Sequence, residues 1–195
     1  MMKKYELTND TVLLGNHILY RIRALIDIDN RVKKGELGGY IESESNLSHN
    51  GKCWIDGNAF VYENALIKDN CQVYDFAEIY GNALLENDVR IYEFAEIRDD
   101  VKIHNNVSIG GNVKLSGKVE IYDNARIDEN VIIHGKDIVI NNHCQISGNV
   151  EVYDYVCIGG WCEISGNIRL LDYCIINGNI KLCGNETICG NEWRC

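Results

Sequence analysis

Residues 61–84 read Val-Tyr-Glu-Asn-Ala-Leu, Ile-Lys-Asp-Asn-Cys-Gln, Val-Tyr-Asp-Phe-Ala-Glu, Ile-Tyr-Gly-Asn-Ala-Leu, and this run of four hexapeptides decides the fold. Each hexapeptide begins with a large aliphatic residue and has a small apolar residue at its fifth position. The pattern recurs from Ile55 to Ile188, about two-thirds of the chain. A period of six fits neither an amphipathic helix nor a long alternating strand. It fits a short strand followed by a two-residue corner, with the aliphatic and small residues pointing inward.

A second period of eighteen residues shows how many strands make one turn. The heptapeptide at 73–79 returns at 91–97, and the one at 152–158 returns at 170–176. Three hexapeptides therefore close one turn, which predicts a triangular parallel β-helix of between seven and eight turns. Equivalent aromatic residues should then stack about 4.8 Å apart. The predicted pairs are Phe76 with Phe94, Tyr155 with Tyr173, Tyr62 with Tyr80 and Tyr74 with Tyr92.

The corners are predicted at Asp69-Asn70 and at repeated Gly-Asn pairs such as Gly81-Asn82, because Gly and Asn tolerate positive φ. The six-residue register runs unbroken from Ile55 to Ile133 and then slips by one residue within 135–139. A one-residue insertion of this kind predicts a bulge at a corner.

Residues 1–48 do not follow the repeat, and we expect them to form a small N-terminal β cap on a β-helix of residues 49–195. Lys4–Leu7 is expected to be a short strand, and Thr11–Ile28 a hairpin with its turn at Gly15-Asn16. Alternation along the second strand predicts that Ile18 shares a face with Ile22. A cap of this kind protects the backbone groups of the first turn from pairing with another chain.

The hexapeptide run resembles the hexapeptide-repeat, left-handed parallel β-helix family, and the resemblance implies the handedness. The stretch Leu37-Gly-Gly-Tyr-Ile-Glu-Ser-Glu-Ser-Asn-Leu-Ser48, followed by Gly51-Lys-Cys-Trp-Ile55, is similar to uncharacterised bacterial and phage members that are labelled transferases. The family includes both acyltransferases and proteins without catalytic activity, so its fold does not choose between these functions.

The composition restricts the function and location further. The formal net charge of −10 argues against direct nucleic-acid binding, which needs clustered Lys and Arg. With no apolar run that could target or span a membrane, we expect a cytoplasmic protein. The nine cysteines lack a Cys-x-x-Cys zinc pattern. Cys53, Cys71, Cys144 and Cys162 take small inward positions and are interpreted as core residues, whereas Cys157, Cys183 and Cys189 are predicted to point outward.

One histidine is a candidate for catalysis. The resemblance implies trimeric acyltransferases with a histidine general base near an extruded loop, and His134, beside the one-residue insertion, is the candidate base here. The alternative is a solvated surface histidine, and the family's extruded loop is missing. His104 is the other histidine that takes an outward position on a coil face, and His143 falls at a different angle, so no shared metal site is predicted. We expect no cofactor unless the protein is an acyltransferase, which would use acetyl-CoA or another acyl-CoA.

Outward apolar residues gather near the C-terminal end and define a C-terminal apolar surface. We interpret it as an interface between copies of the chain, although stacked aromatic ladders that only stabilise the turns are the alternative. The last turn is followed by few residues, so we also expect a second copy or a partner to cover it. The members of this surface are Val139, Tyr153, Tyr155, Cys157, Leu171, Tyr173, Ile175 and Trp193.

Acidic residues stack in the first half of the column and define an acidic patch of Asp75, Glu78, Glu93, Glu96, Asp99 and Asp100. The patch is either a solvated face or a surface that inhibits a host nucleic-acid enzyme. Three functions therefore stay open. The leading hypothesis is a non-enzymatic binding or scaffold protein that self-associates, has protein partners and is encoded by a phage or mobile element. The alternatives are an acyl-CoA-dependent acyltransferase and an acidic inhibitor of a host enzyme.

Overall fold

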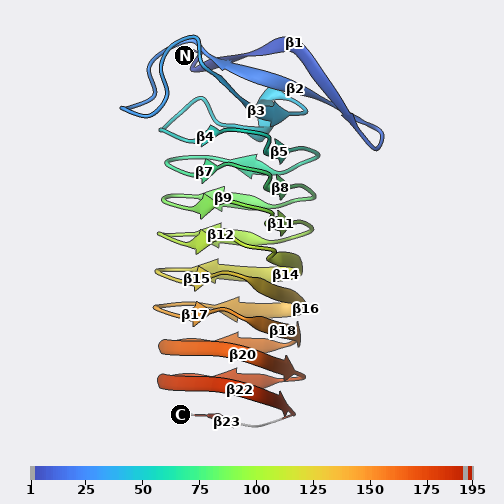
Figure 1. Cartoon of the computed structure of the whole chain (residues 1–195), viewed down its shortest axis with the longest axis vertical. Coiled ribbons are helices and arrows are strands. Elements are labelled where there is room, and N and C mark those ends of the chain that lie inside the picture. Colours follow the sequence, from blue (N-terminus) through green and yellow to red (C-terminus); the bar gives the residue numbers. More distant parts are fainter. Residues whose placement is uncertain (1–2, 191–192, 195) are drawn as a thin grey trace.

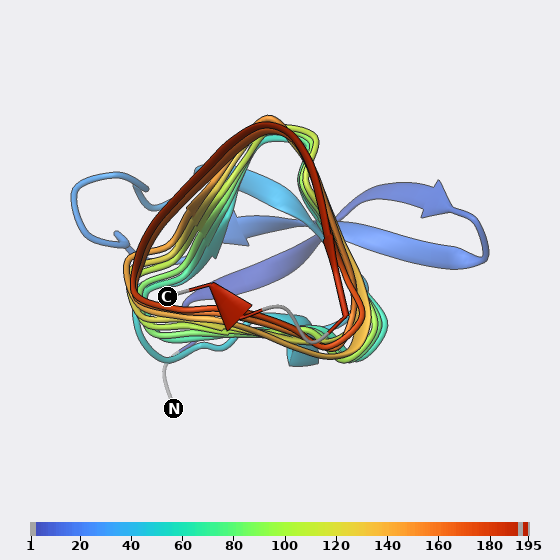
Figure 2. The same ribbon diagram turned by 90° about the horizontal axis from the view of Figure 1, so that it is seen from below.

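The chain is a triangular column of parallel strands with an antiparallel strand pair at its N-terminal end (Figures 1 and 2). The computed structural model describes residues 3–190 and, for the backbone only, 193–194. The column is a left-handed β-helix of about 8 turns, which confirms the fold predicted from the hexapeptides. No helix in the described part of the chain is long and apolar enough to span a membrane.

Each side of the triangle is one ladder of parallel strands. The first ladder consists of β4 (Trp54–Ile55), β7 (Gln72–Val73), β10 (Arg90–Ile91), β13 (Ser108–Ile109), β15 (Arg126–Ile127), β17 (Gln145–Ile146), β20 (Trp161–Leu171) and β22 (Asn179–Cys189). The second consists of β3 (Leu37–Ile41), β5 (Phe60–Val61), β8 (Glu78–Ile79), β11 (Glu96–Ile97), β14 (Lys114–Tyr122), β16 (Asn130–Ile140) and β18 (Asn149–Asp154), and it continues into β20 and β22. The third consists of β6 (Leu66–Ile67), β9 (Leu84–Glu86), β12 (Lys102–His104), parts of β14 and β16, β19 (Val156–Ile158), β21 (Cys174–Ile176) and β23 (Trp193–Arg194).

The core is a stack of the aliphatic and small residues predicted to point inward. Ile55, Val61 and Ile67 start successive hexapeptides and have no exposed surface, and Ala59 and Ala65 between them are equally buried. Burial of each large aliphatic side chain contributes about 1.5–3 kcal/mol of transfer free energy. The same two inward positions recur in every turn, so the column has one continuous core.

The cysteines follow the inward and outward positions predicted for them. Cys53, Cys71, Cys144 and Cys162 are buried in the core. Their thiols donate to backbone carbonyls at the corners, as Cys162 Sγ does to Gly159 O at 2.7 Å. The outward cysteines Cys157, Cys183 and Cys189 are half-buried, exposed and exposed, respectively.

The aromatic pairs stack as the eighteen-residue period predicts. The ring centroids lie 4.9 Å apart for Tyr62 and Tyr80, 5.6 Å for Tyr74 and Tyr92, 5.3 Å for Phe76 and Phe94, and 4.8 Å for Tyr155 and Tyr173. Every pair is within 13° of coplanar. These offsets confirm that three hexapeptides make one turn.

The corners combine a positive-φ residue with an asparagine, but the asparagine of these pairs does not itself take the positive φ that we expected. In Asp69-Asn70 and in the Gly-Asn pairs, the first residue has the positive φ. In most of these corners the asparagine side chain instead hydrogen-bonds to the Asn or Asp at the equivalent position one turn later. One such ladder runs through Asn112, Asn130, Asn149, Asn167 and Asn185, with donor–acceptor distances from 2.5 to 3.1 Å.

The predicted one-residue insertion is present. β14 and β16 pair Gly117 with Gly135 but Val119 with Ile138, so one extra residue of β16 lies opposite Lys118. The Lys118 ammonium binds the Asp137 carboxylate across this bulge at 2.8 Å. The inward positions then resume at Ile138 and Ile140, and the core is not interrupted.

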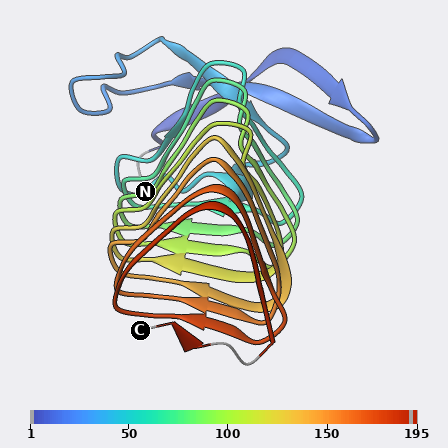
Figure 3. The ribbon, with the colours of Figure 1, turned by 60° about the horizontal axis from the view of Figure 1, so that its bottom comes forward.

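The cap is a hairpin of β1 (Tyr5–Leu14) and β2 (His17–Ala24) that extends beyond the side of the column (Figures 1 and 3). Ile18 is 51% exposed, although Ile22, which we expected on the same face of this strand, is fully buried. Ile18 lies near the hairpin tip, where there is no core to cover it. β3 pairs with β2 in antiparallel and with β5 in parallel fashion, so cap and column share this strand.

Candidate functional site

The stretch Leu37–Ser48, which carries the most specific family resemblance, forms the joint between cap and column. A Cβ on Gly38 would lie 2.4 Å from Ile55 O, and one on Gly39 would lie 2.6 Å from Ala59 O. Only glycine allows the two backbones to approach this closely. The stretch continues through a short 3-10 helix, η1 (Glu44–Asn46), before the first turn of the column begins.

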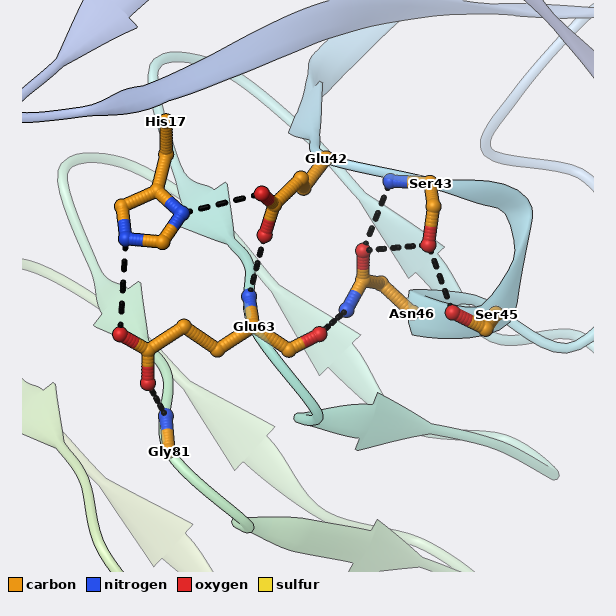
Figure 4. Close-up of polar contacts among 7 residues, drawn as sticks. All are labelled: His17, Glu42, Ser43, Ser45, Asn46, Glu63 and Gly81. Atoms are coloured by element: carbon orange, nitrogen blue, oxygen red, sulfur yellow. Dashed lines mark hydrogen bonds and ion pairs between the residues drawn. The ribbon is translucent and has the colours of Figure 1, made fainter.

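Asn46 is the central residue of this joint and has no exposed surface. Its amide donates to Glu63 O at 3.0 Å, and its carbonyl accepts from Ser43 N at 2.9 Å (Figure 4). The same amide also donates to Ala65 O at 2.9 Å. The side chain thus continues the hydrogen bonding of the column where no strand does. The joint between cap and column therefore explains, in structural terms, the sequence of residues 37–48.

A polar cluster beside Asn46 ties the hairpin to the first two turns (Figure 4). His17 Nδ1 lies 2.9 Å from a Glu42 oxygen, and His17 Nε2 lies 3.5 Å from a Glu63 oxygen. The other oxygens of these two carboxylates accept from Glu63 N at 2.7 Å and from Gly81 N at 2.9 Å. The hydrogen bond with Glu42 raises the pKa of His17, and the same bond lowers the pKa of Glu42. The cluster holds the cap in place by charge-assisted hydrogen bonds.

A buried lysine lies at the same end of the molecule. Lys4 is 2% exposed, and its ammonium nitrogen lies 2.8 Å from Cys53 O and 3.1 Å from Cys53 Sγ. Burial lowers the pKa of Lys4 and raises the pKa of Cys53. The neutral forms of both groups are therefore favoured relative to the unfolded chain.

His134 lies on the outer face of β16, as predicted, and is exposed. Its Nδ1 is 2.8 Å from the hydroxyl of Ser116, one turn earlier. It borders a hollow of about 310 Å³ that is also lined by Glu96, Arg98, Lys114 and Tyr153. The Glu96 carboxylate lies 3.7 Å from Arg98 Nε and 3.6 Å from Lys114 Nζ. The hydroxyl fixes the imidazole ring, and an imidazole at the rim of a hollow can accept a proton from a bound hydroxyl or amine.

The remaining histidines make separate contacts. His104 stacks on Tyr122 with ring centroids 5.0 Å apart, and His143 stacks on Trp161 at 4.0 Å. His143 is exposed at a corner, so it is a further outward histidine that we had not assigned to the surface. Within the described ranges, no group of three or more His, Cys, Asp or Glu residues could hold a metal ion.

The carboxylates of the acidic patch accept hydrogen bonds from their own chain. Asp75, Glu93 and Asp99 have positive φ and accept from backbone N–H groups one turn later, at 2.9 to 3.1 Å. Glu78 and Glu96 accept from the hydroxyls of Tyr62 and Tyr80, and Asp100 accepts from the Asn82 amide. Such charge-assisted bonds offset the cost of the left-handed backbone conformation. The patch therefore has an internal structural role.

Five members of the C-terminal apolar surface line a single hollow of about 370 Å³: Val139, Tyr155, Cys157, Tyr173 and Ile175. The stacked rings of Tyr155 and Tyr173 stand at its rim and are 37% and 62% exposed. Tyr153 does not line this hollow but lines the one that His134 borders, and Leu171 occupies the equivalent position one turn later. The backbone of Trp193 pairs with Ile175, but its side chain lies outside the described residues.

The family comparison agrees with this architecture. Residues 82–117 match the family model described as Bacterial transferase hexapeptide (six repeats). The hexapeptide pattern continues on both sides of the match, so the column is built of hexapeptide repeats. The matched residues run from one Gly-Asn corner through Gly117, just before the bulge. No curated protein matches the chain.

Some features of the hexapeptide-repeat protein were not predicted from its sequence. The bond between Ser116 and His134 follows from the eighteen-residue offset and could have been found from the repeat alone. The hollow beneath the loop between β2 and β3 could not have been predicted from the repeat, because the hexapeptides do not indicate where that loop crosses the column.

Proposed function

We propose that this hexapeptide-repeat protein is a non-enzymatic binding or scaffold protein that works as a homo-oligomer. The C-terminal apolar surface is the contact between copies, and the other faces are open to protein partners. A phage or another mobile element is the origin that suits such a protein. The observation that supports the proposal is the apolar hollow beside the exposed Tyr155–Tyr173 stack.

The chemistry of this surface favours contact with a second copy. Exposed aromatic rings at the rim of an apolar hollow are typical of interface residues, since their burial removes much apolar area from water. The strands beneath them belong to a continuous hydrogen-bonded column, so the surface is rigid before binding. A rigid surface loses little conformational freedom on association.

The test compares double substitutions at two surfaces that each carry an exposed aromatic stack. Tyr173→Asp with Ile175→Asp places charges on the C-terminal apolar surface, while Phe76→Asp with Phe94→Asp places them at another exposed stack. We expect sedimentation velocity to give an oligomer for the wild type and the Phe variant, and a monomer for the Tyr173/Ile175 variant. Equal sedimentation of wild type and the Tyr173/Ile175 variant would contradict the proposal.

Acyl transfer from an acyl-CoA is a second candidate function. It is favoured by the position of His134, which is held by Ser116 at the rim of a hollow with Arg98 and Lys114. In this reading His134 is the general base for an acceptor hydroxyl or amine, and the two cations bind phosphate groups of the donor.

A thermal-shift series with acetyl-CoA tests this second candidate. Acetyl-CoA should raise the melting temperature of the wild type, and Lys114→Glu should remove the shift. Lys102→Glu changes an exposed lysine of β12 outside this hollow and is the matched control. A melting temperature that does not respond to acetyl-CoA argues against acyl transfer.

A further inference from the structure

The loop between β2 and β3 covers part of the first ladder and forms a groove with it. Two hollows meet there, one of about 350 Å³ and one of about 220 Å³, and both are lined by Arg31 and Gln72. We call the two hollows together the loop groove. The loop lies at the cap end of the molecule and stands out from one corner of the triangle (Figures 1 and 2). A small-molecule site of ordinary size needs about 300–1,000 Å³.

The tip of the loop is fixed by its own residues. Ile28 and Val32 are buried in the core, and Ile28 N donates to Val32 O at 2.8 Å. Between them, the Asp29 carboxylate accepts from Arg31 N at 2.8 Å and from the Arg31 guanidinium at 2.8 Å. These bonds lower the pKa of Asp29 to about 2, so the pair stays charged. The Arg31 side chain is thus oriented at the junction of the two hollows before any ligand binds.

The smaller hollow is the cationic end of the loop groove. Arg31, Lys52 and Arg90 line it together with the carboxylates of Asp29 and Asp88. One of these carboxylates is occupied by Arg31, and the other accepts from the Asn70 amide at 3.2 Å. Lys52 and Arg90 are exposed at the hollow. This local excess of positive charge, in a chain of net charge −10, suits one phosphate group.

The larger hollow is the aromatic end. Tyr74 lines it, and the Tyr74 ring is held by the stack with Tyr92, at 5.6 Å and 13°. Trp54, which is 3% exposed, forms part of the wall. Asp56 and Asp75 also line this hollow, and their carboxylates can accept hydrogen bonds from amino or hydroxyl groups. A planar base attached to a sugar fits such a hollow, since bases stack on aromatic side chains and the base and sugar carry hydrogen-bond donors.

We propose that the loop groove binds a mononucleotide. The phosphate lies between Arg31, Lys52 and Arg90, and the base lies against Tyr74. Asp56 and Asp75 accept hydrogen bonds from the exocyclic amine or the sugar hydroxyls. The site is separate from the C-terminal apolar surface, so a failure of this proposal leaves the self-association proposal intact.

Isothermal titration of the full chain with AMP, GMP, CMP and UMP tests the proposal, with inorganic phosphate and adenosine as partial ligands. Arg90→Glu reverses a charge in the loop groove. Arg126→Glu makes the same change two turns further along the same ladder and is the matched control. We expect at least one nucleotide to bind the wild type and Arg126→Glu equally, with at least tenfold weaker binding to Arg90→Glu and to Tyr74→Ala.

Two results would overturn the proposal. One is the absence of heat of binding for all four nucleotides at millimolar concentration. The other is binding of inorganic phosphate as tightly as any nucleotide with no effect of Tyr74→Ala, which would make the groove an anion site without base recognition. Thermal melting of each variant, compared with wild type, checks that it is folded.

Discussion

Asn46 should contribute more to the stability of the cap than any exposed corner asparagine. Asn46→Ala removes three hydrogen bonds with backbone atoms, namely Glu63 O, Ala65 O and Ser43 N, from a site with no exposed surface. Each such bond contributes about 1 kcal/mol net, and a buried group left without a partner costs somewhat more. We therefore expect the free energy of unfolding to fall by about 3 kcal/mol.

The measurement is urea unfolding combined with hydrogen exchange. Asn112→Ala is the control, because it removes one exposed ladder bond of 3.0 Å and should cost less than about 1 kcal/mol. In Asn46→Ala, the amides of β2 and β3 should lose protection while those of residues 82–117 keep theirs, since each turn contacts only its neighbours. Equal losses of stability in the two variants, or a uniform loss of protection, would refute the reasoning.

Three further predictions concern the cap and the corners. The pKa of His17 is raised in the folded state, so its contribution to stability is complete below about pH 6.5 and is lost at higher pH. The urea midpoints of wild type and His17→Ala should therefore differ more at pH 5.5 than at pH 8. The pKa of Lys4 is lowered, so wild type should gain stability relative to Lys4→Met as the pH rises from 8 toward 10.5, and parallel midpoints would contradict this. Gly117 has φ +85° and a Cβ there would lie 2.1 Å from Gly135 O, so Gly117→Ala should cost about 3 kcal/mol in thermal unfolding; Gly15→Ala, at φ +59° with open space around it, should cost only about 1 kcal/mol.

The column could be predicted from the sequence because the same local rule is repeated in every turn. A residue such as Ile67 is inward whatever the rest of the chain does, and the eighteen-residue offset brings Tyr155 onto Tyr173 without further information. The insertion beside His134 was also visible, since a single slipped residue changes every later inward position.

The rest depends on contacts between segments that have no common repeat. The loop that carries Arg31 is anchored to the column by the buried side chains of Ile28 and Val32. Two apolar residues in a polar loop do not indicate which part of the column they contact. The exposure of Ile18 depends on how far the hairpin extends beyond the core. The structural role of the acidic patch could not be predicted, because it depends on the geometry of the corners. Asp75 has a positive φ, and its carboxylate accepts a hydrogen bond from the backbone of the next turn.

The most direct test of self-association on the C-terminal apolar surface is the rate of maleimide labelling of the unmodified chain at increasing protein concentration. Cys157 lies in the apolar hollow and is half-buried, and burial raises its pKa. Cys183 is exposed outside that hollow and serves as the internal reference. The account predicts that labelling of Cys157 slows as concentration rises while labelling of Cys183 keeps its rate. A Cys157 rate that stays constant from nanomolar to high micromolar protein would contradict it.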